Sequence, residues 1–378
     1  MLRKGTFILM KTKIQDMTSG SPGRLIILFA IPLMLGNICQ QLYTMVDTMV
    51  VGQVAGVEAL AALGAVDFLM WVVTGISTGL TQGFSIQLSQ YYGAKDFENL
   101  RKSLAHSYRL TAFIAAGVLI LSQSFASLVL TGLHTPSNII GMSLLYLRII
   151  FCGIPATAAY NMFASALRAM GNSKTPLTAM IIASVLNVSL DILFVAGFGW
   201  GVAGAAIATV IAQSFSAAYC FLILRRIDIV HLTRADFMPA SGMNARLMKL
   251  GIPVVFQNII IGVGGLVVQY VINGYGFLFV AGFTATNKLY GLLEMAAISY
   301  GYAIVTYVGQ NLGAGKIDRI RKGVRSSMLL SLLTSLIISA AMFLFGKNIL
   351  SLFISGEPQQ TQQVLAIAFK YLSIMAAM

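Results

Sequence analysis

The sequence predicts an all-α polytopic membrane protein made of two six-helix bundles, related by a pseudo-twofold axis along the membrane normal, with the second bundle truncated. Three observations lead to this fold class. Of the 378 residues, 57% are hydrophobic and only 10% are charged, whereas a soluble domain carries about 25% charged residues. The apolar residues gather in ten long stretches, and part of the sequence recurs further along the chain.

Each long apolar stretch is a candidate membrane helix. Most of the ten are long enough, as helices, to cross about 30 Å of hydrocarbon. We therefore expect membrane helices at about 25–50, 57–84, 108–130, 139–164, 176–196, 202–224, 250–272, 279–308, 326–346 and 362–378.

The positive charge orients this bundle. The net charge is +13, and most of the 25 lysines and arginines fall in the N-terminal tail and in alternate loops. The opposite loops contain only Lys347. This positive-inside distribution places the N-terminus in the cytoplasm. It also explains the basic character without a nucleic-acid partner.

A sequence repeat divides the chain into two related units. The recurrence has a period of ~220 residues, long enough to contain several helices, and suits the duplicated bundles of many secondary transporters. The matched pairs are Gln90 and Gln310, Gly93 and Gly313, Arg101 and Arg321, Lys102 and Lys322, Pro32 and Pro253, and Asn37 and Asn258. Six helices per unit, an even number, would give both units the same orientation in the membrane.

These boundaries define four segments. Residues 1–23 form a cytoplasmic tail, and 24–224 form the N-lobe of six helices. The polar segment 225–248 is a cytoplasmic linker, and 249–378 form the C-lobe with the seventh to tenth helices. Because the repeat would extend beyond Met378, we expect the tenth helix to be incomplete and two further helices to be missing.

The sequence offers little for an enzyme or a resident cofactor. The segment ending at Lys316 resembles a phosphate loop, but Gln310 and Ile317 stand where glycine and Ser/Thr are required. No nucleophile–base pair is evident. The three cysteines (Cys39, Cys152 and Cys220) lack the spacing of a zinc site or a disulfide framework. We expect a non-enzyme without cofactors.

Carboxylates inside the predicted helices are the main functional signal, because a charge in the bilayer is costly. Asp47 has Gln40, Tyr43 and Thr44 on its own helix face. Asp191 shares a face with Asn187, and the next helix offers Thr209. Carboxylate, amide and hydroxyl oxygens suit a hard cation such as Na⁺. Two close carboxylates could instead carry a proton. These residues could also be structural, with the acids paired to Arg148.

Other intramembrane groups give weaker signals. Asp67 could lie at the outer interface in a structural role. Glu294 lies near Lys288, but their spacing does not suit an ion pair on one face of a helix. We keep Lys288 as a candidate cavity residue. Pro32 lies inside the first predicted helix, where it permits either a functional hinge or a static kink.

Four segments of the sequence resemble the multidrug and toxic compound extrusion (MATE) family of cation-coupled antiporters. The Asn–x₃–Asp pattern is similar to the prokaryotic branch with its acids in the N-terminal lobe. The segments are 46–52 around Asp47, 186–191 around Asn187 and Asp191, 168–176 after the fourth span, and 308–316 after the eighth.

The resemblance implies two six-helix bundles around a V-shaped cleft, with alternating access. It implies that Asp47, Asn187, Asp191 and Thr209 bind the coupling cation, with Na⁺ as the candidate metal. Gln40, Tyr43 and Asn161 would then line the substrate cavity, and bending at Pro32 would fit a hinge. The family's last two helices have no counterpart in this chain.

We therefore expect a secondary active exporter in the inner membrane of a prokaryote, working as a monomer among membrane lipids. It would exchange amphipathic or cationic drugs for inward Na⁺ or H⁺. The alternative is a flippase for a lipid-linked precursor, although the few cations inside the spans favour cationic cargo. A passive channel or an intramembrane enzyme would be a different class of protein.

Overall fold

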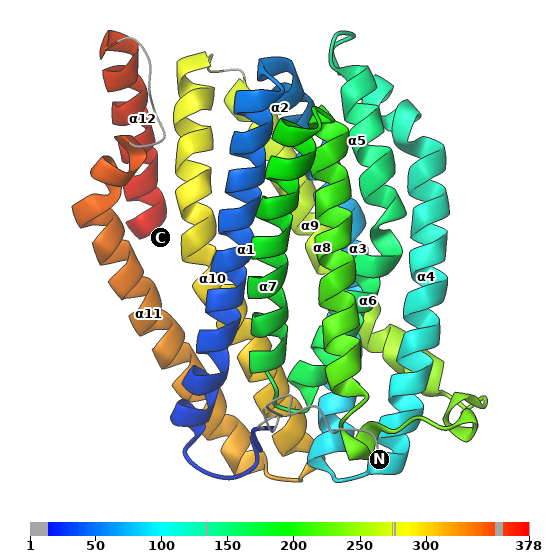
Figure 1. Cartoon of the computed structure of the whole chain (residues 1–378). Coiled ribbons are helices and arrows are strands. Elements are labelled where there is room, and N and C mark those ends of the chain that lie inside the picture. Colours follow the sequence, from blue (N-terminus) through cyan, green and yellow to red (C-terminus); the bar gives the residue numbers. More distant parts are fainter. Residues whose placement is uncertain (1–13, 134, 274, 276, 352–357, 378) are drawn as a thin grey trace, which may run out of the picture.

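The computed structural model describes residues 14–133, 135–273, 275, 277–351 and 358–377, and it is a bundle of long, roughly aligned helices (Figure 1). No strand occurs within these ranges. The helices are α1 (Pro22–Val54), α2 (Val57–Gly64), α3 (Asp67–Gly93), α4 (Phe97–Gly132), α5 (Ile140–Cys152), α6 (Ile154–Ala169), α7 (Lys174–Asp191), the π-helix η1 (Ile192–Gly197), α8 (Gly201–Leu224), the 3₁₀ helices η2 (Asp228–Val230) and η3 (Arg234–Phe237), α9 (Met243–Asn273), α10 (Phe277–Gly313), α11 (Ile317–Ser351) and α12 (Pro358–Ala377).

Every predicted membrane segment corresponds to a helix or to a bent helix pair. Six helices in the described ranges are long and apolar enough to cross a membrane, or up to eight if each bent pair counts as one span. The bent pairs are α2 with α3 and α5 with α6. The structure is therefore an all-α polytopic membrane fold, as the sequence predicts.

A glycine makes one of these bends possible. The axes of α5 and α6 differ by 46° across Gly153. A Cβ atom at Gly153 would lie 2.6 Å from a methyl group of Val210 on α8 and 3.0 Å from the Ile150 carbonyl, so a side chain here would force its neighbours to shift. Pro155 lies in the first turn of α6, where its missing N–H costs little.

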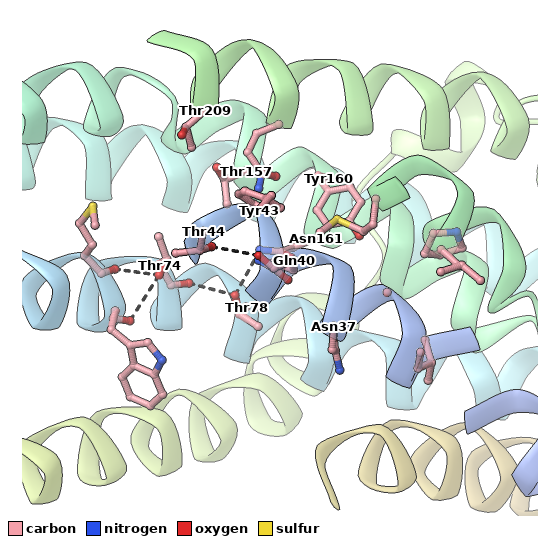
Figure 2. Close-up of a pocket in the computed structure, with 18 of the residues that line it drawn as sticks. Asn37, Gln40, Tyr43, Thr44, Thr74, Thr78, Thr157, Tyr160, Asn161 and Thr209 are labelled. Carbon is pink, nitrogen blue, oxygen red and sulfur yellow. Dashed lines mark hydrogen bonds between the residues drawn. The ribbon is translucent and has the colours of Figure 1, made fainter. Parts of the chain in front are cut away.

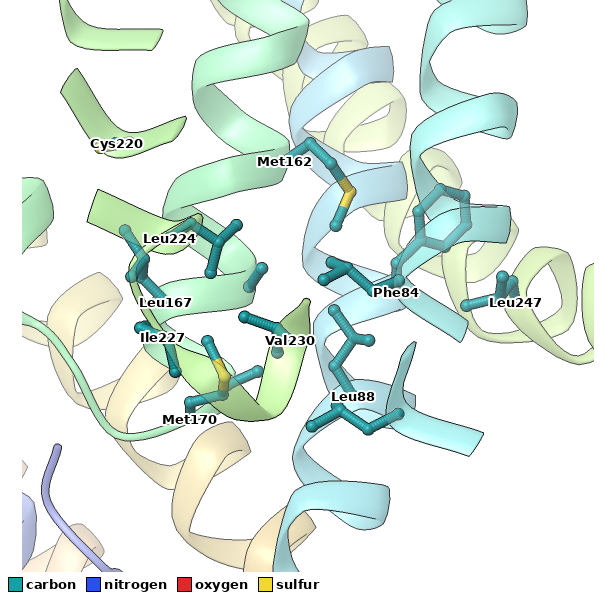
Figure 3. Close-up of a cluster of buried hydrophobic side chains, with 14 of the residues drawn as sticks. Phe84, Leu88, Met162, Leu167, Met170, Cys220, Leu224, Ile227, Val230 and Leu247 are labelled. Atoms are coloured by element: carbon teal, nitrogen blue, oxygen red, sulfur yellow. The ribbon is translucent and has the colours of Figure 1, made fainter. Parts of the chain in front are cut away.

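One buried apolar core joins the first lobe to the linker. Phe84 and Leu88 of α3 pack with Met162 and Leu167 of α6 in a fully buried cluster (Figure 3). The same cluster takes in Ile227 and Val230 of the linker, and Met243 and Leu247 of α9. Helix α9 begins at Met243, within the segment that the sequence assigns to the linker. Buried apolar contacts thus hold the linker against the first lobe.

Two of the repeated residues make equivalent contacts between the lobes. Asn37 of α1 donates its amide hydrogen to Ser299 Oγ of α10 at 3.2 Å. Asn258 of α9 donates to the Gly75 carbonyl of α3 at 3.1 Å. In each case, the first helix of one lobe contacts a helix of the other lobe. The recurrence of asparagine therefore has a packing reason.

The repeated glycines also lie at the lobe interface. Gly93 ends α3, and Gly313 ends α10. A Cβ at Gly93 would collide with the Gln310 carbonyl, and a Cβ at Gly313 would collide with the Gln90 carbonyl. The two helix ends therefore cross backbone to backbone, a close approach that only glycine permits.

Candidate functional site

A polar cavity of about 440 Å³ lies among the helices of the first lobe, and α10 closes part of it through Tyr302. Figure 2 shows side chains of α1, α3, α6 and α8 directed into this space. Gln40, Tyr43, Asn161 and Thr209, which the sequence singles out, all line it, and Pro32 does too. The wall combines aromatic, amide, hydroxyl and carboxylate groups, as a binding site for an amphipathic molecule requires.

Helix α1 supplies one polar stripe of this wall. Gln40, Tyr43, Thr44 and Asp47 recur at helical spacing and face the same cavity. The Thr44 hydroxyl donates to the Gln40 carbonyl at 3.0 Å. Because this bond stays within α1, the Thr44 hydroxyl is satisfied by its own helix (Figure 2).

The facing wall is a hydrogen-bonded pair of helices. Asn161 of α6 donates its amide hydrogen to Thr78 Oγ of α3 at 3.2 Å. Thr78 donates in turn to the Thr74 carbonyl at 3.1 Å, and Thr74 to the Met70 carbonyl at 2.7 Å (Figure 2). These bonds fix the orientation of Asn161, so one edge of the cavity is held rigidly.

Buried oxygen atoms gather beside the cavity, where α1, α7 and α8 meet. Asn187 and Asp191 are fully buried, and Asp47 is 6% exposed. The Asn187 amide donates to Thr209 Oγ at 3.4 Å. Asp47 Oδ1, Asn187 Oδ1 and both carboxylate oxygens of Asp191 are buried with no hydrogen-bond partner among the described residues. Buried acceptors without donors are costly, and a cation or a proton would satisfy them.

The acids of this cluster also act on one another. Asp47 is close enough to Asp191 and to Asp67 for their charges to interact. Among the described residues, no ion pair involves Asp47 or Asp191. Arg148, the structural partner considered from sequence, is exposed on α5 instead. Negative charge thus accumulates here, and it is a favourable place for a cation.

The backbone around Asp191 is unusual. Helix α7 ends at Asp191, and the chain continues as the π-helix η1. Such wider turns are rare and occur frequently at functional sites. Sequence patterns that assume 3.6 residues per turn do not anticipate this change.

Asp67 is a cavity residue, although the sequence favours a structural role for it near the outer interface. It begins α3 and lines the cavity together with Asp47. The sequence indicates only a place near the outer interface for Asp67, and it does not show which residues of other helices lie beside it. Glu294 is exposed on α10 and does not line the cavity. The side chain of Lys288, the remaining candidate, lies outside the described residues.

A family model named MatE matches two segments of the chain, 32–193 and 253–378. Together they cover well over half of the sequence. The chain belongs to the MatE family. The two matched segments begin at Pro32 and Pro253, the prolines that recur between the two halves of the chain.

Relatives of this MatE chain are named as multidrug resistance proteins. It is 31% identical over 363 residues to "Probable multidrug resistance protein YpnP" of Bacillus subtilis, covering 95% of this chain and 81% of the relative. It is 25% identical to "Probable multidrug resistance protein NorM" of Thermotoga maritima, covering 88% of this chain and 72% of the relative.

Solved structures share the fold of this MatE chain. A transporter of the MOP superfamily from Pyrococcus furiosus superposes with a TM-score of 0.90 at 23% identity, covering 96% of this chain and 80% of that one. MATE in complex with MaL6 superposes with a TM-score of 0.89 at 22% identity, covering 97% and 83%. At these identities, the similarity establishes the fold.

Proposed function

We propose that the protein is a secondary active multidrug exporter, which exchanges amphipathic or cationic compounds for inward Na⁺ or H⁺ across the cytoplasmic membrane. The observation that carries this proposal is the cluster of buried, unsatisfied oxygens beside a polar cavity. The cluster suits a small cation, and the cavity suits a larger organic one. Membership of MatE and the multidrug names of its relatives support the same class.

In this proposal, Asp47, Asn187, Asp191 and Thr209 hold the coupling cation. Their oxygens are hard ligands of the kind that Na⁺ prefers, and either carboxylate could take up a proton instead. Binding would neutralise repelling acids and satisfy buried acceptors. The state that offers this cluster to the outside would therefore be stabilised by the cation.

The drug would bind in the cavity. Trp71, Tyr43 and Tyr160 offer apolar faces, and Asp47 and Asp67 offer negative charge. Aromatic faces and carboxylates together favour organic cations. Arg168 is the one cation on the described wall, so a pyrophosphate headgroup finds less charge to bind than a cationic drug does.

The two ligands would be coupled through α1, which carries Asp47 and lines the drug cavity. Pro32 lies inside α1 and cannot donate a backbone hydrogen bond. Bending near Pro32 on cation binding would shrink the cavity and release the drug. Exchange follows because each ligand favours a different state.

Efflux in everted membrane vesicles tests the proposal. Cells expressing the gene would supply vesicles, and a fluorescent organic cation such as ethidium would report transport into their interior. We expect accumulation only when an outwardly directed gradient of Na⁺ or H⁺ is imposed from the vesicle interior. Equal accumulation with and without both gradients would contradict coupling.

Thr209→Val is expected to weaken the cation site. Valine keeps the shape but removes the hydroxyl that accepts from Asn187. We expect the cation concentration for half-maximal efflux to rise several-fold, with the maximal rate retained. Thr209→Ser should restore the wild-type value. Ser214→Ala on the same helix is the control, because that hydroxyl is exposed and bonds only within α8. An unchanged half-maximal cation concentration in Thr209→Val would show that the Thr209 hydroxyl does not contribute to the cation site.

A further inference from the structure

The segment before α1 lies across the cytoplasmic ends of both lobes. Residues 14–20 precede Ser21 and the start of α1 at Pro22, and we call them the strap. Ile14 packs against the buried cluster of the first lobe, and the Gln15 N–H donates to the Gly171 carbonyl at 3.2 Å. Gly171 has φ +89°, and a Cβ there would collide with the Gln15 carbonyl. One end of the strap is thus fitted closely to the turn between α6 and α7.

The other end of the strap is bound by side chains of the C-lobe. Met17 is fully buried with Tyr300, Ala303 and Tyr307 of α10. Its N–H donates to Gln310 Oε1 at 3.0 Å, and its carbonyl accepts from Asn311 Nδ2 at 2.9 Å. The strap is therefore held at Met17 through both the backbone and the side chain.

Two cations complete this binding site. Lys316 Nζ donates to the Thr18 carbonyl at 2.9 Å. Arg319 donates to the Gly20 carbonyl at 2.9 Å, to the Met17 carbonyl at 3.4 Å and to Asn311 Oδ1 at 3.0 Å. We call Gln310, Asn311, Lys316 and Arg319 the socket. Hydrogen bonds from charged donors are about twice as strong as neutral ones.

Asp16 keeps the strap in its bound shape. One of its carboxylate oxygens accepts from the backbone N–H and the hydroxyl of Thr18, both at 2.7 Å. Partial burial alone would raise the pKa of Asp16, but hydrogen bonds from Thr18 and Ser19 and the charge of Lys316 hold it below its usual value. The carboxylate is therefore ionised at neutral pH, and the turn persists.

Gln310 shows why the strap bears on the movement of the lobes. This residue is fully buried, and its amide donates to the Ala169 carbonyl of α6 at 2.8 Å while its oxygen accepts from Met17. One side chain thus joins α10, α6 and the strap. If α6 moves away from α10 to open the cytoplasmic side, this junction cannot survive intact.

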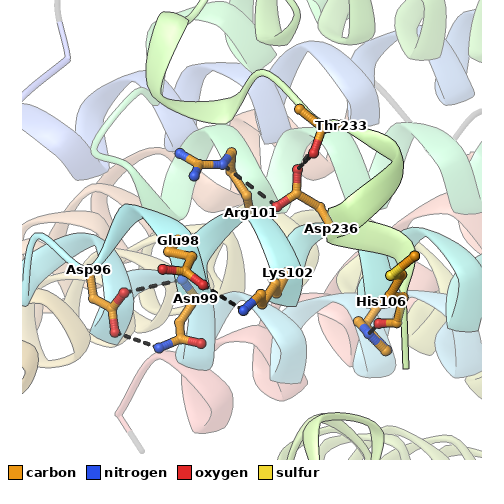
Figure 4. Close-up of polar contacts among 9 residues, drawn as sticks. Asp96, Glu98, Asn99, Arg101, Lys102, His106, Thr233 and Asp236 are labelled. Carbon is orange, nitrogen blue, oxygen red and sulfur yellow. Dashed lines mark hydrogen bonds and ion pairs between the residues drawn. The ribbon is translucent and has the colours of Figure 1, made fainter. Parts of the chain in front are cut away.

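The linker before α9 makes related contacts with α4 of the first lobe. Arg109 of α4 donates to the Phe237 carbonyl at 3.0 Å, and His106 lies 3.0 Å from the Met238 carbonyl. Arg101 and Asp236 form an ion pair at 3.7 Å (Figure 4). Asp236 lies shortly before the start of α9, as Asp16 lies shortly before the start of α1. In both repeats, the segment before the first helix is thus bound by the opposite lobe.

We propose that the strap locks the cytoplasmic side closed, and that it must leave the socket before the cavity can open to the cytoplasm. This inference rests on the alternating access of the proposed function. Because the strap is bound to both lobes, separation of their cytoplasmic ends has to break one set of its hydrogen bonds. The socket residues therefore set how often the protein opens inward.

The first test measures the distance between the lobes without requiring transport. Spin labels at Lys174→Cys on α7 and Lys322→Cys on α11 would report the cytoplasmic separation by pulsed electron resonance. Both positions are exposed. The labels are placed in a background without the native thiols, which carries Cys39→Ser, Cys152→Ser and Cys220→Ala.

Arg319→Gln is expected to raise the population with a long distance several-fold, because three hydrogen bonds to the strap and Asn311 are weakened. The matched control is Arg321→Gln. This substitution removes the same charge two residues further along α11, where the side chain is exposed. If Arg319→Gln gives the same distances as Arg321→Gln, the strap does not hold the lobes together.

The second test locks the strap in place. A reducible bifunctional thiol reagent would join Thr18→Cys to Lys316→Cys, and the control pair Glu98→Cys with Lys102→Cys lies within α4. We expect efflux to stop when the strap is linked, to return on reduction, and to continue in the linked control. Undiminished efflux with the strap linked would overturn the proposal. If the wild-type protein shows no efflux but Arg319→Gln still shifts the distances, the proposed role of the strap is supported and the proposed exporter function is wrong.

Discussion

Asp191→Asn is expected to abolish cation-driven efflux, with the rate in everted vesicles falling by on the order of tenfold or more. Asparagine keeps the size and one acceptor of the side chain but removes the charge. Asp191 is fully buried, and both its carboxylate oxygens lack partners among the described residues. The charge therefore supplies the attraction that offsets the cost of taking a cation out of water.

Asp228→Asn is the matched control for Asp191→Asn. Asp228 is exposed in η2, outside the membrane helices, so loss of its charge should leave efflux unchanged. Purified Asp191→Asn protein should still bind ethidium, because Asp191 does not line the cavity. Gradient-driven efflux by Asp191→Asn at the wild-type rate would show that the coupling cation binds elsewhere.

Gly313→Ala is expected to have the largest effect on the assembly of the two lobes. The added methyl group would meet the Gln90 carbonyl and the backbone N of Ala94, neither of which can rotate away as a side chain can. Overpacking of this kind costs about 1–3 kcal/mol, and more where only backbone can yield. We expect a lower melting temperature of the purified protein and little efflux.

Gly301→Ala provides the matched control on the same helix. No atom lies within 4 Å of a Cβ built at Gly301, and alanine favours a helix by about 1 kcal/mol over glycine. Thermal unfolding in detergent, followed by size-exclusion chromatography, should show Gly301→Ala at or slightly above the wild-type midpoint. Equal midpoints for the two variants would mean that α3 and α10 do not cross as closely as described.

The sequence predicts the helices well because each one must be apolar over a length set by the bilayer. All ten expected segments correspond to a helix or to a bent pair in the structure. The repeat of Gly93 and Gly313, and of Asn37 and Asn258, also has a visible reason, since each residue meets the opposite lobe. Such positions repeat because the two interfaces are related by the same pseudosymmetry.

The candidate site is only partly accessible to sequence reasoning. Helical spacing is enough to place Gln40, Tyr43 and Asp47 on one face, and the structure shows that face directed into the cavity. Helical spacing does not reveal that Asp67, from another helix, lines the same cavity. The π-helix after Asp191 is also hidden, because residue types alone do not indicate a wider turn.

The strap shows a second limit of the sequence. Residues 1–23 are polar and basic, and a tail of this composition gives no sign of a bound conformation. Its contacts depend on Gln310 and Arg319, almost three hundred residues away in the chain. Only the folded arrangement brings these groups together.

Cation movement driven by the drug tests the central claim most directly. Purified protein would be reconstituted in proteoliposomes, and an outward gradient of ethidium would be imposed with no cation gradient. The account predicts that Na⁺ or H⁺ accumulates inside the proteoliposomes as ethidium leaves, because coupling between two ligands is reciprocal. Ethidium efflux without any movement of Na⁺ or H⁺ would contradict exchange and leave a passive pathway in its place.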